Sequence, residues 1–377
     1  KSVNEIGLPE DVEDDIFNVI KNQTYINMSL YQLENKMNKY DLSRAQKARI
    51  KGLYNNLLEE YSKAIIFDYS YKFFYEDGYG KDYNILNLKE TQLREYNDNF
   101  LLANLISFYE QKLLYQEKEQ VLDEYNLENP LLLFVGHTVS ASGSLTVDDK
   151  ASISDVEYVI QFIDKILNNR TDVIQSIEDI LYNKGFKDKQ GKDVFADRFT
   201  YLKKNDLTAT KIYDDILQKV FNTSSAISQP LKLYEIKNAE GEIGLRVKGD
   251  DYFGLINIGD VSRLKKKLKK SGIAILEDEF SDSFFNSINS YKSDINVLIG
   301  SRKFTEGWNS YRVSSIGLLN IGKGESPQII QLFGRGVRLR GLNNSLQRST
   351  VFEDKEHPDY IELLETLNVF GIKADYM

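Results

Sequence analysis

Residues Gly300 to Arg340 read GSRKFTEGWNSYRVSSIGLLNIGKGESPQIIQLFGRGVRLR, and the interpretation of the whole chain starts from them. They include seven basic side chains and two acidic ones, a local charge of +5 in a chain whose net charge is −9. The apolar run Ile316–Ile321 predicts a buried strand. Ser326 and Pro327 then predict a helix start, because serine caps free N–H groups and proline suits the first helical position. This combination predicts a binding site for an anion.

Three polar side chains lie along the expected helix. If the helix continues, the i, i+4, i+7 spacing places Gln331, Arg335 and Arg338 on one face. Gly334 and Gly336 leave room for a ligand to approach closely. We therefore expect this face to bind a phosphate group.

Composition limits the remaining possibilities. The chain has 377 residues, of which 41% are hydrophobic and 28% charged, as in soluble globular proteins of two or three domains. It contains no cysteine and only two histidines, which excludes disulfides and makes a metal site improbable. There is no apolar run of about 18 residues and no basic leader, so we expect a cytoplasmic protein without a membrane segment. A pI near 5.1 restricts nucleic-acid contact to local patches.

Strand and helix patterns alternate through the second half of the chain. A hairpin is expected at Leu231–Lys237 and Glu242–Val247 around a turn. The strands expected after it are 252–258, 273–276, 295–299 and 316–321, and the helices are 262–270, 282–290 and one starting at 327. Such alternation predicts a parallel sheet whose ligands lie beyond the carboxyl ends of the strands, where Gly300–Asn309 and Gly322–Ser326 would lie.

The first half is mainly helical until Pro130. Helices are expected within 22–63, with a break at 39–41, and within 91–127. Ala64–Tyr75 and Asn84–Leu88 are expected to be strands. Leu131–Val135 is wholly apolar and predicts a strand buried on both faces, followed by an insertion with helices at 155–168 and 171–183. A last apolar helix is expected around Leu363, Leu364, Leu367 and Val369.

Two segments of the opening stretch resemble helicase motifs. QLFGRGVR, from Gln331 to Arg338, resembles motif VI of superfamily 2 helicases, and TEGWN, from Thr305 to Asn309, looks like motif V. Together they are similar to the helicase subunit of type III restriction enzymes. Leu131–Val139 matches motif IV of that subunit, and Glu362–Met377 resembles it as well.

This resemblance implies a fold and a division into domains. The chain would be α/β, with residues 129–345 forming the second RecA-like domain, a parallel sheet flanked by helices with a helical insertion at about 140–230. Residues 1–128 would be a largely helical region with a short β segment, leading from the first RecA-like domain, and residues 346–377 a helical tail. The P-loop and the acidic DExx motif of the first domain are not found, so we interpret the chain as a fragment.

The resemblance also implies an activity, ATP-dependent DNA translocation or unwinding, and a set of site residues. Arg335 and Arg338 would act on the γ-phosphate, with Arg338 more often the arginine finger, and this fragment alone would be inactive. The remaining expected contacts are with the nucleotide, through Gln331, Gly334, Glu306, Gly307 and Asn309, and with DNA, through Arg302, Lys303, Thr305, His137 and Thr138. Asn309 stands where the family usually has Asp. ATP and Mg²⁺ would be bound mainly by the first domain.

The partners implied are DNA and the first RecA-like domain of the same polypeptide. A nuclease domain downstream and a methyltransferase subunit would also fit a restriction-modification system. No nuclease pattern occurs in this chain, so DNA cleavage would reside elsewhere.

Alternative interpretations remain for several segments. Gly317–Lys323 (GLLNIGK) matches the first seven positions of a P-loop, which would make the chain a self-contained ATPase. The basic run Arg263–Lys270 is either a solvated helix face or a DNA contact. Trp308 is either a wedge against the core or part of the site. Finally, the helices at 22–63 and 91–127 could form the surface of a non-enzymatic interaction module.

Overall fold

The computed structural model describes residues 30–52, 69–88, 93–136, 147–182, 186, 193–223, 230–259, 261–270, 272–300, 308–319 and 327–372. The chain divides into two compact units, Lys1–Lys72 and Phe73–Met377. Within the described residues, no helix is long and apolar enough to cross a membrane.

The first unit contains two helical segments separated by a short turn. Helix α2 spans Leu30–Met37, and residues 44–52 are also helical. Ser43 and Gln46 cap the second segment reciprocally: the Gln46 N–H donates to Ser43 Oγ at 3.2 Å, and the Ser43 N–H donates to Gln46 Oε1 at 2.9 Å. This capping box starts the second segment and confirms the predicted break.

The second unit is built on a mostly parallel sheet. Within the described residues it has nine strands, in the order β1-β9-β8-β2-β7-β5-β4-β3-β6. Their bounds are β1 Asp82–Leu88, β2 Leu131–Gly136, β3 Leu231–Ile236, β4 Glu242–Val247, β5 Gly254–Asn257, β6 Ile275–Asp278, β7 Val297–Gly300, β8 Val313–Leu319 and β9 Thr366–Ile372. Of these, β4 pairs antiparallel with both of its neighbours, and the other pairs are parallel. The α/β class and the hairpin β3–β4 are confirmed.

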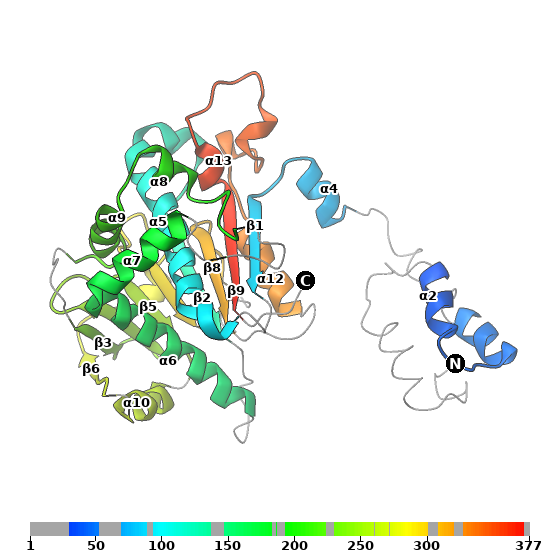
Figure 1. The fold of residues 1–377 in the computed structure, drawn as a ribbon, viewed down its shortest axis with the longest axis horizontal. Coiled ribbons are helices and arrows are strands. Elements are labelled where there is room, and N and C mark those ends of the chain that lie inside the picture. Colours follow the sequence, from blue (N-terminus) through cyan, green and yellow to red (C-terminus); the bar gives the residue numbers. More distant parts are fainter. Residues whose placement is uncertain are drawn as a thin grey trace. The chain divides into compact units, whose positions relative to one another are not determined.

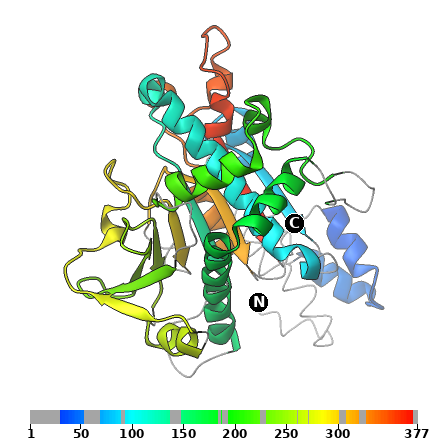
Figure 2. The ribbon, with the colours of Figure 1, turned by 60° about the vertical axis from the view of Figure 1, so that its left-hand side comes forward.

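Helices cover both faces of this sheet. Besides α2 and the helical segment 44–52, the described helices are α4 Tyr71–Glu76, α5 Leu93–Leu122, α6 Val147–Asn168, α7 Arg170–Leu181, α8 Thr200–Lys204, α9 Ala209–Asp215, α10 Val261–Lys270, α11 Phe284–Ser287, α12 Pro327–Gly336 and α13 Ile361–Leu364. Short helical turns are η2 Asp123–Tyr125, η3 Ile216–Val220, η5 Leu342–Asn344 and η6 Ser349–Val351. Figure 1 shows α5, α6 and α7 together on one side of the sheet, and Figure 2 shows α10 beside α6 at the side that carries β3 and β6.

The central strand β2 divides its side chains between two hydrophobic cores. Leu132 and Phe134 point into the larger core, whereas Leu131, Leu133 and Val135 point into the smaller one. Every residue of β2 is buried, which explains its continuous apolar sequence. Burying each such side chain stabilises the fold by about 1.5–3 kcal/mol.

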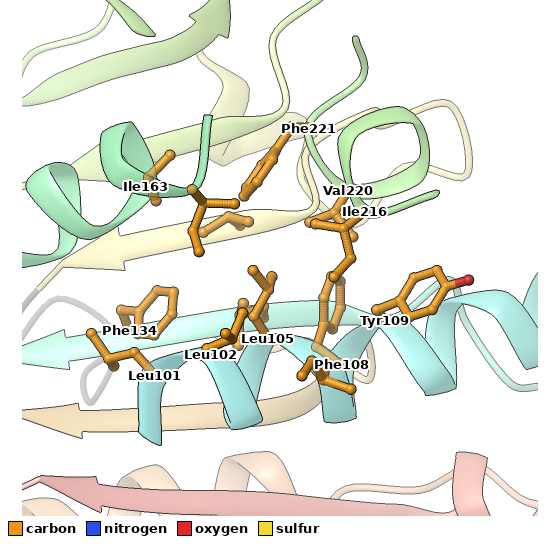
Figure 3. Packing of buried hydrophobic residues seen from close by; sticks show 14 of the residues in the cluster. Leu101, Leu102, Leu105, Phe108, Tyr109, Phe134, Ile163, Ile216, Val220 and Phe221 are labelled. Carbon is orange, nitrogen blue, oxygen red and sulfur yellow. The ribbon is translucent and has the colours of Figure 1, made fainter. Parts of the chain in front are cut away.

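The larger core is organised around α5. Figure 3 shows Leu101, Leu105 and Phe108 of α5 facing side chains from β2, α6 and η3. The predicted insertion therefore packs on α5 as part of one core, rather than standing apart from the sheet. The single 30-residue helix α5 packs on β9, β8 and β2, and α6 continues this layer over β2, β3 and β7.

Two secondary-structure predictions are wrong. Within the segment predicted as a strand, 64–75, residues 71–75 begin helix α4, and residues 64–68 lie outside the described part. The tail contains the short helix α13, but Leu367 and Val369 belong to β9, which pairs with both β1 and β8. Leu367 and Val369 point into the smaller core, and Phe370 points into the larger one. Successive side chains that point to opposite faces of a sheet are typical of a strand, which explains why this segment is extended.

The compact units also differ from the predicted domains. We expected boundaries after residues 128 and 345, but the sheet unit begins at Phe73. The physical reason is that β1 pairs along its whole length with β9, while α5 lies on the sheet. Segments on both sides of the expected boundaries thus complete the same sheet.

Candidate functional site

Helix α12 lies on the face of the sheet that holds the smaller core. Its Leu332 is buried there, and Phe333 meets Tyr83 edge-on with ring centroids 5.1 Å apart. A Cβ at Gly336 would lie 2.8 Å from Leu367 Cδ2, whereas at Gly334 it would meet nothing within 4 Å. Gly336 therefore permits close packing on β9 and does not leave room for a ligand, contrary to our expectation. Gly334 faces open space, as predicted.

The helix ends before Arg338. The Val337 N–H still donates to the Phe333 carbonyl at 3.0 Å, but the Arg338 N–H reaches back only to Arg335, at 3.4 Å. Arg338 thus lies in the turn that follows α12, so the predicted single face containing all three polar side chains is wrong. Gln331 is exposed on the helix itself.

Arg335 and Arg338 both contact the segment that leads into β8. Arg335 Nη1 donates to the backbone carbonyl of Trp308, and Arg338 Nη1 donates to Asn309 Oδ1. Both acceptors are neutral, so these two hydrogen bonds orient the guanidiniums without cancelling charge. The structure brings together two predicted catalytic residues and one predicted nucleotide contact.

Trp308 anchors this arrangement in the core. Its side chain is 6% exposed and stacks on Phe285 of α11 with ring centroids 6.1 Å apart. The carbonyl of the next residue, Asn309, accepts a hydrogen bond from Asn289 Nδ2 at 2.7 Å. Trp308 is therefore the predicted wedge, and it holds its own carbonyl in place for Arg335.

The two guanidiniums influence each other electrostatically. Burial lowers the pKa of Arg335, and the nearby charge of Arg338 lowers it further. Guanidiniums nevertheless stay protonated in proteins at neutral pH, so each of the two side chains carries a positive charge. An anion placed between two such charges would reduce their repulsion.

The site lies toward the amino end of the sheet. The carbonyl of Val337, next to Arg338, accepts a hydrogen bond from the N–H of Lys81, the residue before β1, at 2.7 Å. Asn309 likewise precedes β8 by a few residues. We expected residues Gly300–Asn309 to lie beyond the carboxyl ends of the strands. For Asn309 this prediction is wrong, because Asn309 lies just before the amino end of β8.

Seven predicted site residues lie outside the described part of the chain. They are His137, Thr138, Arg302, Lys303, Thr305, Glu306 and Gly307. In the sequence they follow the last residues of β2 and β7. Their assignment to DNA and nucleotide contacts stays a prediction.

The position of Gly317 contradicts the P-loop alternative. Gly317 lies in the middle of β8, and a Cβ there would be 2.6 Å from the Phe134 ring. Leu318 and Leu319 are buried in the same strand. A phosphate cradle needs exposed backbone N–H groups, which a paired central strand does not offer. Residues 320–323 lie outside the described part.

The basic helix α10 is partly neutralised by carboxylates. Lys267 pairs with Glu157 at 3.1 Å, and Lys265 pairs with Glu235. Lys266 is exposed. The predicted row of buried leucines is confirmed, and the ion pairs fit a solvated helix face better than a DNA contact.

One residue close to the site was missed by the sequence analysis. Lys81 follows Gly78-Tyr79-Gly80, and it is only 4% exposed and contacts the start of β8. A lysine directly before a strand carries no signal of burial. Among the described residues, no group of three or more His, Asp or Glu side chains could hold a metal ion.

Comparisons with known proteins find no match for this chain, neither among protein-family models nor among curated proteins or solved structures.

Proposed function

We propose that this chain carries the second RecA-like domain of an ATP-dependent DNA translocase or helicase of superfamily 2, of the type III restriction kind. The observation that supports this most directly is the pairing of Arg335 and Arg338 at the end of α12, beside Asn309. The mostly parallel sheet is compatible with such a domain. The motif-like sequences supply the remaining support.

Each arginine has a separate role in the proposed mechanism. Bound ATP supplies a γ-phosphoryl group whose oxygens gain negative charge as it is transferred. Arg338 lies in the turn after the helix and donates to a neutral side-chain amide, so it can exchange this acceptor for a phosphate oxygen. Arg335, on the helix and anchored to the Trp308 carbonyl, holds a second positive charge nearby. Together they stabilise the developing charge only when a nucleotide-bearing domain closes on this face.

Gln331 is the third side chain in the proposed mechanism. It is exposed on α12 one turn before Arg335, so its amide can orient the nucleotide or the attacking water. The proposal assigns no step on this chain to Mg²⁺. Magnesium belongs to the domain that holds the phosphates.

The decisive experiment substitutes Arg338→Ala in a polypeptide that also contains a nucleotide-binding domain. We expect DNA-dependent ATP turnover to fall by about 10³-fold or more, the size of effect of an arginine finger. Arg340→Ala is the matched control. Arg340 lies two residues away and pairs with Glu128 at 3.1 Å on the surface, so its loss should change turnover by less than about twofold.

Unchanged turnover in Arg338→Ala would refute the proposal. The same holds if this chain on its own hydrolyses ATP, with or without duplex DNA, because the proposed site is only one wall of the nucleotide cleft.

A further inference from the structure

Lys81 is a buried lysine that joins two segments far apart in the sequence. Its backbone N–H donates to the Val337 carbonyl at 2.7 Å. Its ammonium group donates to the carbonyls of Tyr311 and Val313 at 3.1 and 2.5 Å. One residue thus fixes the chain just after α12 and the chain just before β8.

These two segments carry the partners of the proposed site. Arg338 directly follows Val337, and Asn309 comes two residues before Tyr311. We propose that Lys81 is a positioning residue, which holds Arg338 and Asn309 at the separation that their hydrogen bond requires. The consequence for catalysis rests on the proposed function, whereas the effect on the Arg338–Asn309 pair does not.

The geometry of the ammonium contacts suits this role. Tyr311 and Val313 are two residues apart, and the chain bends at Tyr311, so one ammonium group binds both carbonyls. Lys81 therefore fixes the direction in which the chain enters β8, and with it the position of Asn309.

The residue before Lys81 supports the same interpretation. Gly80 has φ +70°, and a Cβ there would lie 2.8 Å from the Val337 carbonyl oxygen. The turn before β1 thus approaches the turn before Arg338 more closely than any side chain would allow. This approach lets the Lys81 N–H reach Val337.

Burial of the ammonium group sets Lys81 apart from an ordinary core residue. Burial lowers its pKa to about 8, while the charges of Glu128 and Glu365 act in the opposite direction. The three acceptors that Lys81 contacts are neutral backbone carbonyls. A methionine of similar length would fill the same space without carrying a buried charge, so the lysine contributes fixed hydrogen-bond geometry rather than packing.

The first test measures the Arg338 side chain directly in this chain. Arginine side-chain NMR signals should show the hydrogen-bonded, slowly rotating guanidinium of Arg338 in the wild type. Lys81→Met should shift this signal to that of a solvent-exposed arginine. Lys112→Met is the matched control, because Lys112 is also 4% exposed but donates to Asn129 and Asn296, so the Arg338 signal should be unchanged.

The second test measures turnover in a polypeptide that contains the nucleotide-binding domain. Lys81→Met should lower kcat by roughly 10²-fold, the effect of misplacing a catalytic group by about 1 Å, while KM for ATP changes by less than about threefold. Lys81→Gln, whose amide nitrogen still donates hydrogen bonds, should recover part of kcat. Arg338→Ala is measured in parallel as the reference.

The outcomes separate the two proposals. If Arg338→Ala keeps full turnover, the proposed function fails, and the NMR result alone decides the role of Lys81. If Arg338→Ala is inactive but Lys81→Met keeps both kcat and the Arg338 signal, the positioning role is overturned. Should Lys81→Met not fold, the same measurements on Lys81→Gln decide, and an unaltered Arg338 signal with full kcat overturns the inference.

Discussion

Replacing Lys112 by methionine should change how the stability of this chain depends on pH. Lys112 lies on α5 with 4% of its surface exposed, and its ammonium group donates to Asn129 Oδ1 and Asn296 Oδ1, both at 2.7 Å. Burial, together with the nearby charge of Arg312, lowers its pKa from an ordinary value of 10.5 to about 7. In the unfolded chain the pKa returns to the ordinary value.

The sign and size of the effect follow from this difference. Below pH 7 both states are protonated, and the folded state carries the full penalty of the buried charge. Above pH 7 the folded state releases the proton while the unfolded chain retains it, so stability rises with pH. Between pH 7 and 9 this adds about 2 kcal/mol to the free energy of unfolding.

The assay is chemical unfolding at pH 7, 8 and 9, followed by circular dichroism. The wild type should gain about 2 kcal/mol more than Lys112→Met over this range. Lys81 contributes in the same direction, since burial lowers its pKa to about 8, but it is common to both proteins and cancels in the difference. Lys266→Met, at an exposed position on α10, should follow the wild type. Identical pH dependence in wild type and Lys112→Met would show that the ammonium is not buried as described.

Two further predictions concern the packing around Gly317 and the buried carboxyl group of Glu110. Gly317→Ala should lower the free energy of unfolding by about 1–3 kcal/mol because its Cβ would lie 2.6 Å from the Phe134 ring, whereas Gly334→Ala, in open space, should not destabilise the chain. Urea unfolding of both variants checks this. Burial raises the pKa of Glu110 from 4.5 to about 7, so it makes the wild type lose stability as pH rises, by about 2 kcal/mol between pH 5 and pH 7. Glu110→Gln should remove that part of the pH dependence, and unfolding curves at pH 5 and 7 measure it.

Local sequence patterns predicted the helices and strands whose form is decided by residues close in the sequence. A continuous apolar run indicated β2, a turn signature indicated the hairpin β3–β4, and helical spacing indicated helix within 91–127, where α5 lies. The segment at β9 was misinterpreted because Leu363, Leu364 and Leu367 also fit helical spacing. Its extended form depends on pairing with β1 and β8, which lie far away in the sequence.

The candidate site was predictable in composition but not in geometry. The motif-like sequence pointed to Arg335 and Arg338, and in the structure they donate hydrogen bonds to the Trp308 carbonyl and to Asn309 Oδ1, respectively. The end of α12 at Gly336 and the location at the amino end of β8 depend on how the chain crosses the sheet. Lys81 contacts Tyr311 and Val313 across more than two hundred residues, and no local pattern reports such a contact.

The position of β9 in the sheet has a consequence for how the chain folds while it is being synthesised. β9 fills the space between β1 and β8, although it is made last of the three strands. Until residues 366–372 leave the ribosome, the facing edges of β1 and β8 lack their common neighbour and expose unpaired N–H and C=O groups. The nascent chain therefore has two unpaired strand edges, on β1 and on β8, that can pair with a wrong strand. The sheet is complete only when β9 is inserted between them.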